Sequence, residues 1–143
     1  MKYFFVLPEV AGGLGEHSVL DTSVRPSIVR RLHYQMEGWL GDAILETFPV
    51  FIVTEEAKNA LLESGLSGMA FDEVEVTLSD RFRELYPGRM IPSFAWLKPG
   101  QAGEGDFGVA VDGRLVVSER ALDLLKRLGI SNALVEPFVR TVH

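Results

Sequence analysis

One stretch decides the fold: Val53-Thr54-Glu55-Glu56-Ala57-Lys58-Asn59-Ala60-Leu61-Leu62-Glu63-Ser64-Gly65-Leu66-Ser67. It aligns without gaps on Val117-Ser118-Glu119-Arg120-Ala121-Leu122-Asp123-Leu124-Leu125-Lys126-Arg127-Leu128-Gly129-Ile130-Ser131, and the two copies lie 64 residues apart. Val, Glu, Ala, Leu, Gly and Ser recur at equivalent places. The chain therefore uses one supersecondary unit twice, and two copies are too few for a solenoid.

Each copy predicts a short strand that runs into a capped helix. The strands, at 51–53 and 115–117, consist of β-branched or apolar residues. Thr54 and Ser118 follow where a helix N-cap belongs, and a hydroxyl that accepts a first-turn N–H contributes about 1 kcal/mol. Glutamates come next, in the turn where the helix dipole favours negative charge.

Each predicted helix has one apolar stripe and ends at a glycine. The stripes are Ala57, Ala60, Leu61 and Ser64 in the first copy, and Ala121, Leu124, Leu125 and Leu128 in the second. Gly65 and Gly129 stand where a left-handed residue ends a helix, and extended segments follow at 69–76 and 133–138. Two short helices cannot each bury a core alone. We therefore expect the repeat units, at about 50–76 and 114–138, to pack as related halves or on one shared sheet.

Other segments predict further strands and one more helix. Apolar or alternating runs indicate strands at 3–7, 28–36 and 93–97, and Asp112-Gly113 suits a hairpin turn between 107–111 and 115–117. In the alternating run, Leu32, Tyr34 and Met36 share one face, so His33 on the other face is expected to meet solvent. Ser79 can cap a helix that ends before Pro87-Gly88. We expect a single α+β (α/β-like) domain over 1–143, with mixed sheets and a few short helices.

Composition bounds the class of protein. The chain has 143 residues, 47% of them hydrophobic, which suits one domain with a real core. It has no cysteine, so disulfides and thiolate metal sites are excluded, and a reducing compartment is favoured. The apolar run that begins the chain stops at Pro8-Glu9, which is shorter than an export signal requires. We expect a cytoplasmic protein without a membrane span.

The net charge of −6 argues against nucleic-acid binding, because no basic face is available to neutralise phosphates. An acidic balance would favour a basic protein partner through electrostatic steering. It would equally serve solubility alone, as in many cytosolic proteins.

No catalytic or metal motif emerges. Gly12-Gly13-Leu14-Gly15 lacks the spacing of a phosphate-binding loop and predicts a turn or loop. The histidines, His17, His33 and His143, have no metal-ligand spacing. Acidic pairs at Glu55-Glu56, Asp72-Glu73 and Glu104 with Asp106 are more simply solvated than catalytic. We predict no catalytic residue, no metal and no cofactor, which lowers the expectation of an enzyme without excluding one.

Aromatic and acidic residues near loop boundaries are the candidates for partner contact. Trp39 lies beside Gly38, and Trp96 lies three residues before Pro99; near loop boundaries such as these a tryptophan is either a core plug or an interface anchor. The loop 38–42 could present a ring and a carboxylate outward. The partner-binding candidates are Trp39, Asp42, Trp96, Glu104 and Asp106.

The segment Leu115-Val116-Val117-Ser118-Glu119-Arg120-Ala121-Leu122-Asp123-Leu124-Leu125 resembles a signature of a bacterial immunity-protein family of polymorphic toxin systems, formerly a domain of unknown function. In that family a strand ending in Ser-Glu-(Arg/Lys)-Ala opens a helix, and a Gly-containing turn leads to a final strand. The resemblance is specific over Leu115–Phe138, and the stretch 53–62 looks like the same element. It implies neutralisation of a cognate toxin by direct binding. The matching residues are fold positions, so no functional residue is carried over.

Three functions stay open from the sequence. The first is a non-catalytic binding protein, an immunity protein that blocks a toxin. The alternative is a small enzyme or ligand-binding domain with a site between the two repeat units, because related halves often leave a cleft at their junction. A module that scaffolds its own oligomer is the third.

Overall fold

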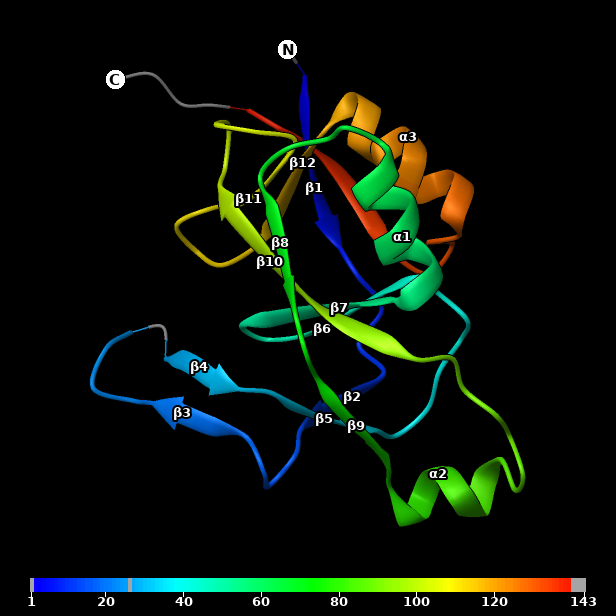
Figure 1. Cartoon of the computed structure of the whole chain (residues 1–143). Helices are drawn as coiled ribbons and strands as arrows, with labels where there is room; N and C mark the ends of the chain where they lie inside the picture. The colour runs from blue at the N-terminus through cyan, green and yellow to red at the C-terminus, as the bar shows by residue number, and fades with distance from the viewer. Residues whose placement is uncertain (1, 26, 140–143) are drawn as a thin grey trace.

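The computed structural model describes residues 2–25 and 27–139, and within them the chain forms one large mixed sheet, two small sheets and three helices (Figure 1). The large sheet has eight strands in the order β13-β1-β12-β11-β10-β7-β6, with β8 paired to β10. They are β1 (Tyr3–Leu7), β6 (Ile44–Thr47), β7 (Val50–Thr54), β8 (Met69–Asp72), β10 (Phe94–Gln101), β11 (Phe107–Val109), β12 (Leu115–Ser118) and β13 (Leu134–Phe138). The predicted α+β class is confirmed.

The remaining elements are short. One small sheet has the order β2-β5-β9 and the other pairs β3 with β4. Their strands are β2 (Gly12–Leu14), β3 (Val19–Asp21), β4 (Ile28–Arg31), β5 (His33–Met36) and β9 (Glu75–Leu78). The helices are α1 (Glu55–Glu63), α2 (Asp80–Leu85) and α3 (Glu119–Leu128). None of the described helices has the length and apolar character needed to cross a membrane.

The two copies of the repeat have the same local structure. Thr54 (φ −61°, ψ 153°) and Ser118 (φ −70°, ψ 164°) are both extended N-caps. Each hydroxyl accepts a hydrogen bond from the backbone N–H three residues on, at 3.1 Å in α1 and 3.2 Å in α3. Gly65 and Gly129 both have positive φ at the helix ends, as predicted. Equivalent sequences therefore begin and end equivalent helices.

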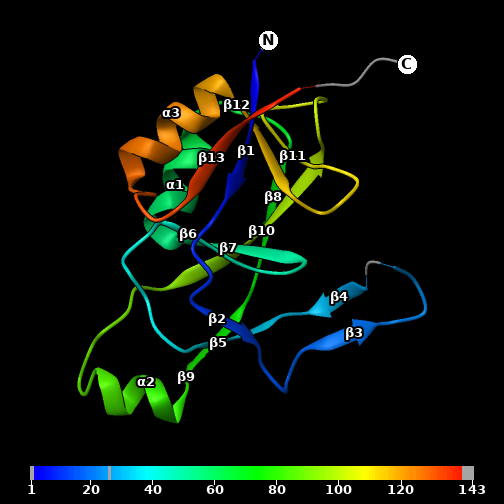
Figure 2. The same cartoon turned by 180° about the vertical axis from the view of Figure 1, so that it is seen from behind.

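The kinship extends to the register of the sheet. In each copy, the strand that follows the helix runs parallel to the strand that precedes it. One antiparallel strand lies between these two. β10 is that middle strand for β7 and β8, and β1 is that middle strand for β12 and β13, as Figure 2 shows for β1 and β13. Trp96 pairs with Asp72, and Phe5 pairs with Glu136, which lies 64 residues after Asp72. The two halves therefore share the same strand order and register.

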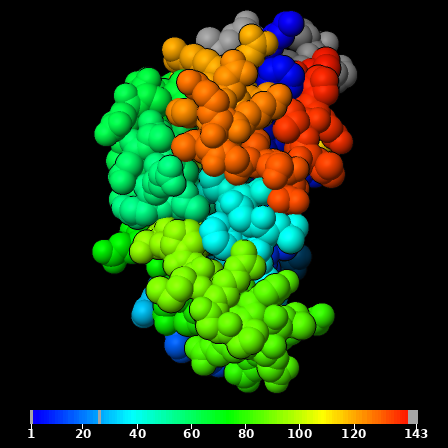
Figure 3. All heavy atoms as spheres, turned by 90° about the vertical axis from the view of Figure 1, so that its right-hand side faces the viewer, coloured from blue at the N-terminus to red at the C-terminus, as the bar shows by residue number. Residues whose placement is uncertain are grey.

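Two equivalent parallel contacts join the halves. Gly100 on β10 pairs with Gly108 on β11, and Glu9, just after β1, forms a parallel bridge with Leu45 on β6. The second contact is an isolated bridge that links the chain just after β1 to the edge strand β6. On one face α1 and α3 lie side by side, as Figure 3 shows in green and orange.

Aspartates clamp each half to the other. The loop after α3 is held by Asp42, whose carboxylate accepts hydrogen bonds from Asn132 N (2.9 Å) and Asn132 Nδ2 (2.8 Å). The loop after α1 is held by Asp106, which accepts from Ser67 N (2.9 Å) and Ser67 Oγ (3.2 Å). Both carboxylates are 2% exposed, so Asp42 does not face outward and Asp106 is not solvated as the sequence suggested. They are buried because they satisfy backbone N–H groups of the opposite half.

Alternation along the strands separates two cores. On β7, Phe51 and Val53 face α1 and α3, whereas Val50 and Ile52 face the opposite side. The second core is covered by two segments, 10–41 and 73–92, which we call the inserted layer. In the other half, the equivalent connection is only the short turn 102–106 between β10 and β11. The inserted layer, made of β2–β5, β9 and α2, is thus what distinguishes one half from the other.

The inserted layer overturns two sequence expectations. Gly12–Leu14, predicted as turn or loop, is strand β2 and pairs with β5. The run 28–36 is divided into β4 and β5, and His33 is buried at 3% exposure rather than facing solvent. His33 is covered by the turn at Gly15–His17 and by Thr77 on β9, both distant in sequence.

Candidate partner-binding cleft

Clefts and exposed apolar side chains concentrate on the inserted layer. Four described clefts, of about 310 to 600 Å³, each have residues of this layer in their walls. The layer also carries nine of the fifteen large apolar side chains that are exposed in the described residues: Val10, Val19, Leu20, Val24, Ile28, Leu40, Leu85, Tyr86 and Met90. Of these nine, Val10, Leu40, Leu85 and Tyr86 line a single cleft, and apolar side chains exposed together in this way are typical of an interaction site.

One of these clefts, of about 450 Å³, combines aromatic, cationic and apolar side chains, and we call it the Trp39 cleft. Segment 9–12, which follows β1, and segment 37–40, which follows β5, form its floor and one wall. The other wall comes from α2 and the residue after it, through Arg81, Leu85 and Tyr86. Figure 3 shows segment 37–40 in cyan, above the yellow-green segment around α2.

Hydrogen bonds fix the floor. Ala11 O accepts from the backbone N–H groups of Glu37 (2.8 Å) and Gly38 (3.1 Å). Ala11 N–H donates to the Tyr34 hydroxyl, which in turn donates to Glu46 O, both at 3.1 Å. Burial raises the pKa of Tyr34 to about 12, so the phenol stays protonated and keeps this donor. The floor is therefore preformed.

A buried carboxylate shapes the wall that carries Trp39. Glu9 is 7% exposed, and it accepts hydrogen bonds from Leu40 N (2.7 Å) and Asp42 N (3.4 Å). Burial raises the pKa of Glu9, and the two backbone donors oppose that rise. The carboxylate is engaged in holding the loop 38–42, which presents Trp39 and Leu40.

Trp39 is half-buried and rigidly placed. Its Nε1–H donates to Asp42 O at 3.0 Å, and its ring meets Phe94 edge-on with centroids 5.9 Å apart. The Arg89 guanidinium lies over both aromatic rings of the cleft, 5.4 Å from the centroid of Trp39 and 5.2 Å from that of Tyr86. These cation–π contacts order a side chain that would otherwise be mobile.

α2 is anchored to the same wall through its N-cap. The Ser79 hydroxyl accepts from Phe82 N and donates to Glu37 Oε2, both at 3.0 Å. This confirms the cap predicted at Ser79. Phe82 is fully buried in the second core, so α2 is pinned on the side opposite the cleft.

Three largely exposed apolar side chains form the rim of the cleft. Val10 is 67% exposed, Leu40 68% and Leu85 56%. They come from three separate segments and converge around Trp39 and Tyr86. Trp, Tyr and Arg are the residues that most often dominate protein–protein binding energy.

The sequence candidates are distributed over different parts of the molecule. Trp39 lines the cleft, and Asp42 lies behind it in a clamp. Trp96 is buried in the second core at 5% exposure, with Lys98 Nζ 4.2 Å from its ring centroid. Glu104 is exposed and Asp106 is buried, both beside β11 and outside the Trp39 cleft. Their roles in partner binding stay predictions.

Sequence reasoning missed the cationic and apolar partners of Trp39. Val10, Leu40, Leu85 and Arg89 are single residues in irregular or terminal segments, where no periodicity marks an exposed apolar group. The dipeptide Leu85-Tyr86 before Pro87-Gly88 is the one local signal, since an apolar pair at the end of a short helix lacks an obvious core.

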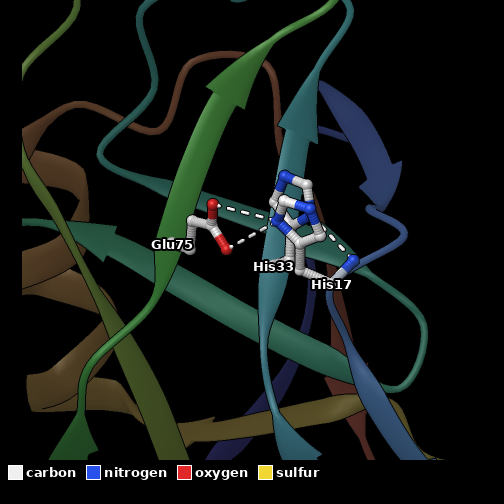
Figure 4. Close-up of side chains that lie close together, drawn as sticks. All are labelled: His17, His33 and Glu75. Atoms are coloured by element: carbon white, nitrogen blue, oxygen red, sulfur yellow. Dashed lines mark hydrogen bonds and ion pairs between the residues drawn. The ribbon is translucent and has the colours of Figure 1, made fainter.

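A second constellation, at the base of the β3–β4 hairpin, also escaped the sequence analysis. Figure 4 shows His17, His33 and Glu75 together, and we call them the histidine latch. His17 Nδ1 lies 3.1 Å from both Glu75 carboxylate oxygens, and the two imidazoles stack with centroids 4.8 Å apart. The bond from His17 holds the pKa of Glu75 below its ordinary value.

The latch fits hydrogen bonding better than a metal ion, although its ligand atoms lie within 4.8 Å of one another. His17 N–H donates to His33 Nδ1 (3.2 Å), so the neutral ring donates through Nε2 to Thr77 Oγ1 (2.7 Å). Neither ring nitrogen of His33 is then available to an ion. Arg31 Nη2 also lies 3.8 Å from Glu75, where it opposes a cation. His143 lies outside the described residues.

Comparison of the chain with protein-family models, with curated proteins and with solved structures gives no match.

Proposed function

We propose that this chain is a non-catalytic protein-binding protein of the bacterial cytoplasm, an immunity protein that neutralises a cognate toxin by direct binding. One observation carries the proposal. The inserted layer, which distinguishes one half from the other, exposes apolar side chains around a preformed cleft of Trp, Tyr and Arg. That composition is typical of interface hot spots.

The buried carboxylate of this cleft has a structural role, which favours binding over catalysis there. Glu9 accepts two backbone N–H groups, and Glu37 accepts the Ser79 hydroxyl on one of its two oxygens. A general acid or base must reach the substrate with a free proton or lone pair. The resemblance of Leu115–Phe138 to immunity proteins points in the same direction, and the net charge of −6 would steer a basic toxin toward the molecule.

The test is whether a toxin is encoded beside this gene and whether this protein protects cells that express that toxin. Wild-type protein is expected to restore growth and to co-purify with the toxin. Leu40→Asp places a charge on the cleft rim and is expected to weaken toxin binding at least tenfold. Leu62→Asp is the matched control, because Leu62 on α1 is 58% exposed and lies outside the inserted layer.

The outcomes separate the possibilities. Loss of protection with Leu40→Asp but not with Leu62→Asp supports the proposal, provided both variants melt at the wild-type temperature. Failure of the wild-type protein to bind or neutralise the toxin contradicts it.

A further inference from the structure

Resting on the proposed function, we propose that the Trp39 cleft recognises a partner segment in which a carboxylate is flanked by apolar side chains. Two arginines at the cleft and its apolar rim carry this inference, through charge and surface complementarity.

Arg89 is held ready to receive an anion. Its guanidinium carbon lies 5.4 Å from the ring centroid of Trp39 and 5.2 Å from that of Tyr86. These cation–π contacts use the delocalised charge of the group, whereas a carboxylate binds guanidinium N–H groups through two parallel hydrogen bonds. One guanidinium can therefore make both kinds of contact.

Arg81 itself lines the cleft, whereas Arg89 lies against the Trp39 and Tyr86 rings that line it. Among the other described arginines, Arg30, Arg31, Arg114 and Arg120 pair with carboxylates, whereas Arg25, Arg83 and Arg127 do not. Within residues 2–25 and 27–139, no carboxylate oxygen lies within 4.0 Å of a nitrogen of Arg81 or Arg89. Neither of these two cations thus has an ion-pair partner in the described part of the chain.

The acidic residues of the cleft do not take that role. Glu9 is oriented toward the N–H groups of Leu40 and Asp42, and Glu37 toward the hydroxyl of Ser79. Arg89 is close enough to Glu9 to favour its charged form but forms no ion pair with it. A carboxylate brought by a partner would meet N–H donors that these two residues leave unfilled.

The rim of the cleft favours apolar side chains on either side of the partner's carboxylate. Val10, Leu40 and Leu85 are each more than half exposed, and a charged ligand alone would leave them in water. Apolar side chains on either side of the acidic residue would cover them, at about 25 cal/mol for each Å² removed from water. The overall acidity of the chain steers a partner at long range, whereas the cleft reads the residues in contact.

Selection from a random heptapeptide phage library tests the inference without the toxin. On wild-type protein we expect enrichment of Asp or Glu beside Leu, Ile, Val or Phe. A synthetic peptide of the enriched sequence should shift the backbone amide resonances of Val10 and Leu40. The Arg81→Gln/Arg89→Gln double variant should bind it at least tenfold more weakly. Arg127→Gln on α3 should bind as the wild type does, because Arg127 is exposed and lies outside the cleft.

Each contrary result is decisive. The inference is overturned if the enriched peptides lack acidic residues, if they shift resonances away from the cleft, if none is enriched, or if the double variant binds equally well. Arg89→Lys keeps the charge but not the bidentate edge, and it should weaken binding less than Arg89→Gln does. The melting temperatures of these variants, compared with that of the wild type, distinguish a loss of folding from a loss of peptide recognition. A double variant that still neutralises the toxin overturns this inference alone. A wild-type protein that never binds the toxin overturns the proposed function instead.

Discussion

Arg120 grips Asp106 with two parallel hydrogen bonds, 2.7 Å from Nε to Oδ1 and 2.8 Å from Nη2 to Oδ2. The same carboxylate accepts from the Ser118 hydroxyl at 2.6 Å and from Ser67 in the opposite half. One buried carboxylate thus ties the N-cap of α3 to the loop after α1.

Replacement of Asp106 should therefore destabilise the whole fold. Asp106→Asn removes the charge and leaves donors of three residues poorly satisfied, so we expect the free energy of unfolding to fall by about 2–4 kcal/mol. Urea denaturation monitored by Trp fluorescence measures this. Asp112→Asn is the control, because the Asp112–Arg114 pair is exposed and its loss should leave the midpoint unchanged. Equal midpoints for the two variants would refute the assigned role.

The pH dependence of stability should follow the same carboxylate. The Arg120 guanidinium holds the pKa of Asp106 well below its usual range. Near that pH range the folded protein therefore binds fewer protons than the unfolded chain does. That stabilisation is complete above the unfolded pKa near 4 and is lost as pH falls toward the lower folded value. Denaturation between pH 7 and pH 2.5 should show a steep loss below about pH 4.5. Asp106→Asn should flatten that loss, and an unchanged slope would contradict the assignment.

Because the His33 ring is packed against Gly15, a larger residue at position 15 should lower the stability of the fold. A Cβ on Gly15 would overlap the His33 imidazole, whereas a Cβ on Gly13 of β2 would meet no atom within 4 Å. We expect Gly15→Ala to cost about 1–3 kcal/mol through overpacking. Gly13→Ala should be neutral or slightly stabilising. Thermal melts of the two variants measure the difference, and a stable Gly15→Ala protein would show that the latch can open freely.

The sequence predicts the parts of this fold that are encoded locally. Thr54, Ser118, Gly65 and Gly129 act within one or two turns of chain, so their caps and stops are legible without tertiary information. The register of β1 and β10 between the repeat strands is non-local, and no pattern at 3–7 or 93–97 reveals it.

The candidate site can be predicted from the sequence only in part, because most of its contacts join residues that are distant in the chain. Alternation correctly separates His33 from Leu32, Tyr34 and Met36, but it cannot say that Gly15 and Thr77 will cover the second face. Trp39 was found because a tryptophan beside glycine stands out. Nothing in the sequence distinguishes Arg81 and Arg89 from the other arginines. Their proposed role depends on the fold, which brings both side chains to one cleft, where no described carboxylate pairs with them.

The two N-caps should differ in cost although they occupy the same repeat position. The Thr54 hydroxyl accepts from Ala57 N alone, so Thr54→Ala should cost about 1 kcal/mol. The Ser118 hydroxyl is fully buried, accepts from Ala121 N and also donates to Asp106, so Ser118→Ala should cost about twice as much.

A double-mutant cycle assigns the excess to its source. Ser118→Ala combined with Asp106→Asn should be less destabilising than the sum of the single changes, because both remove the same 2.6 Å hydrogen bond. Thr54→Ala combined with Asp106→Asn should be additive, since Thr54 does not touch Asp106. Additivity in both cycles would mean that Ser118 acts only as a cap and that the tie between α3 and the opposite half does not pass through its hydroxyl.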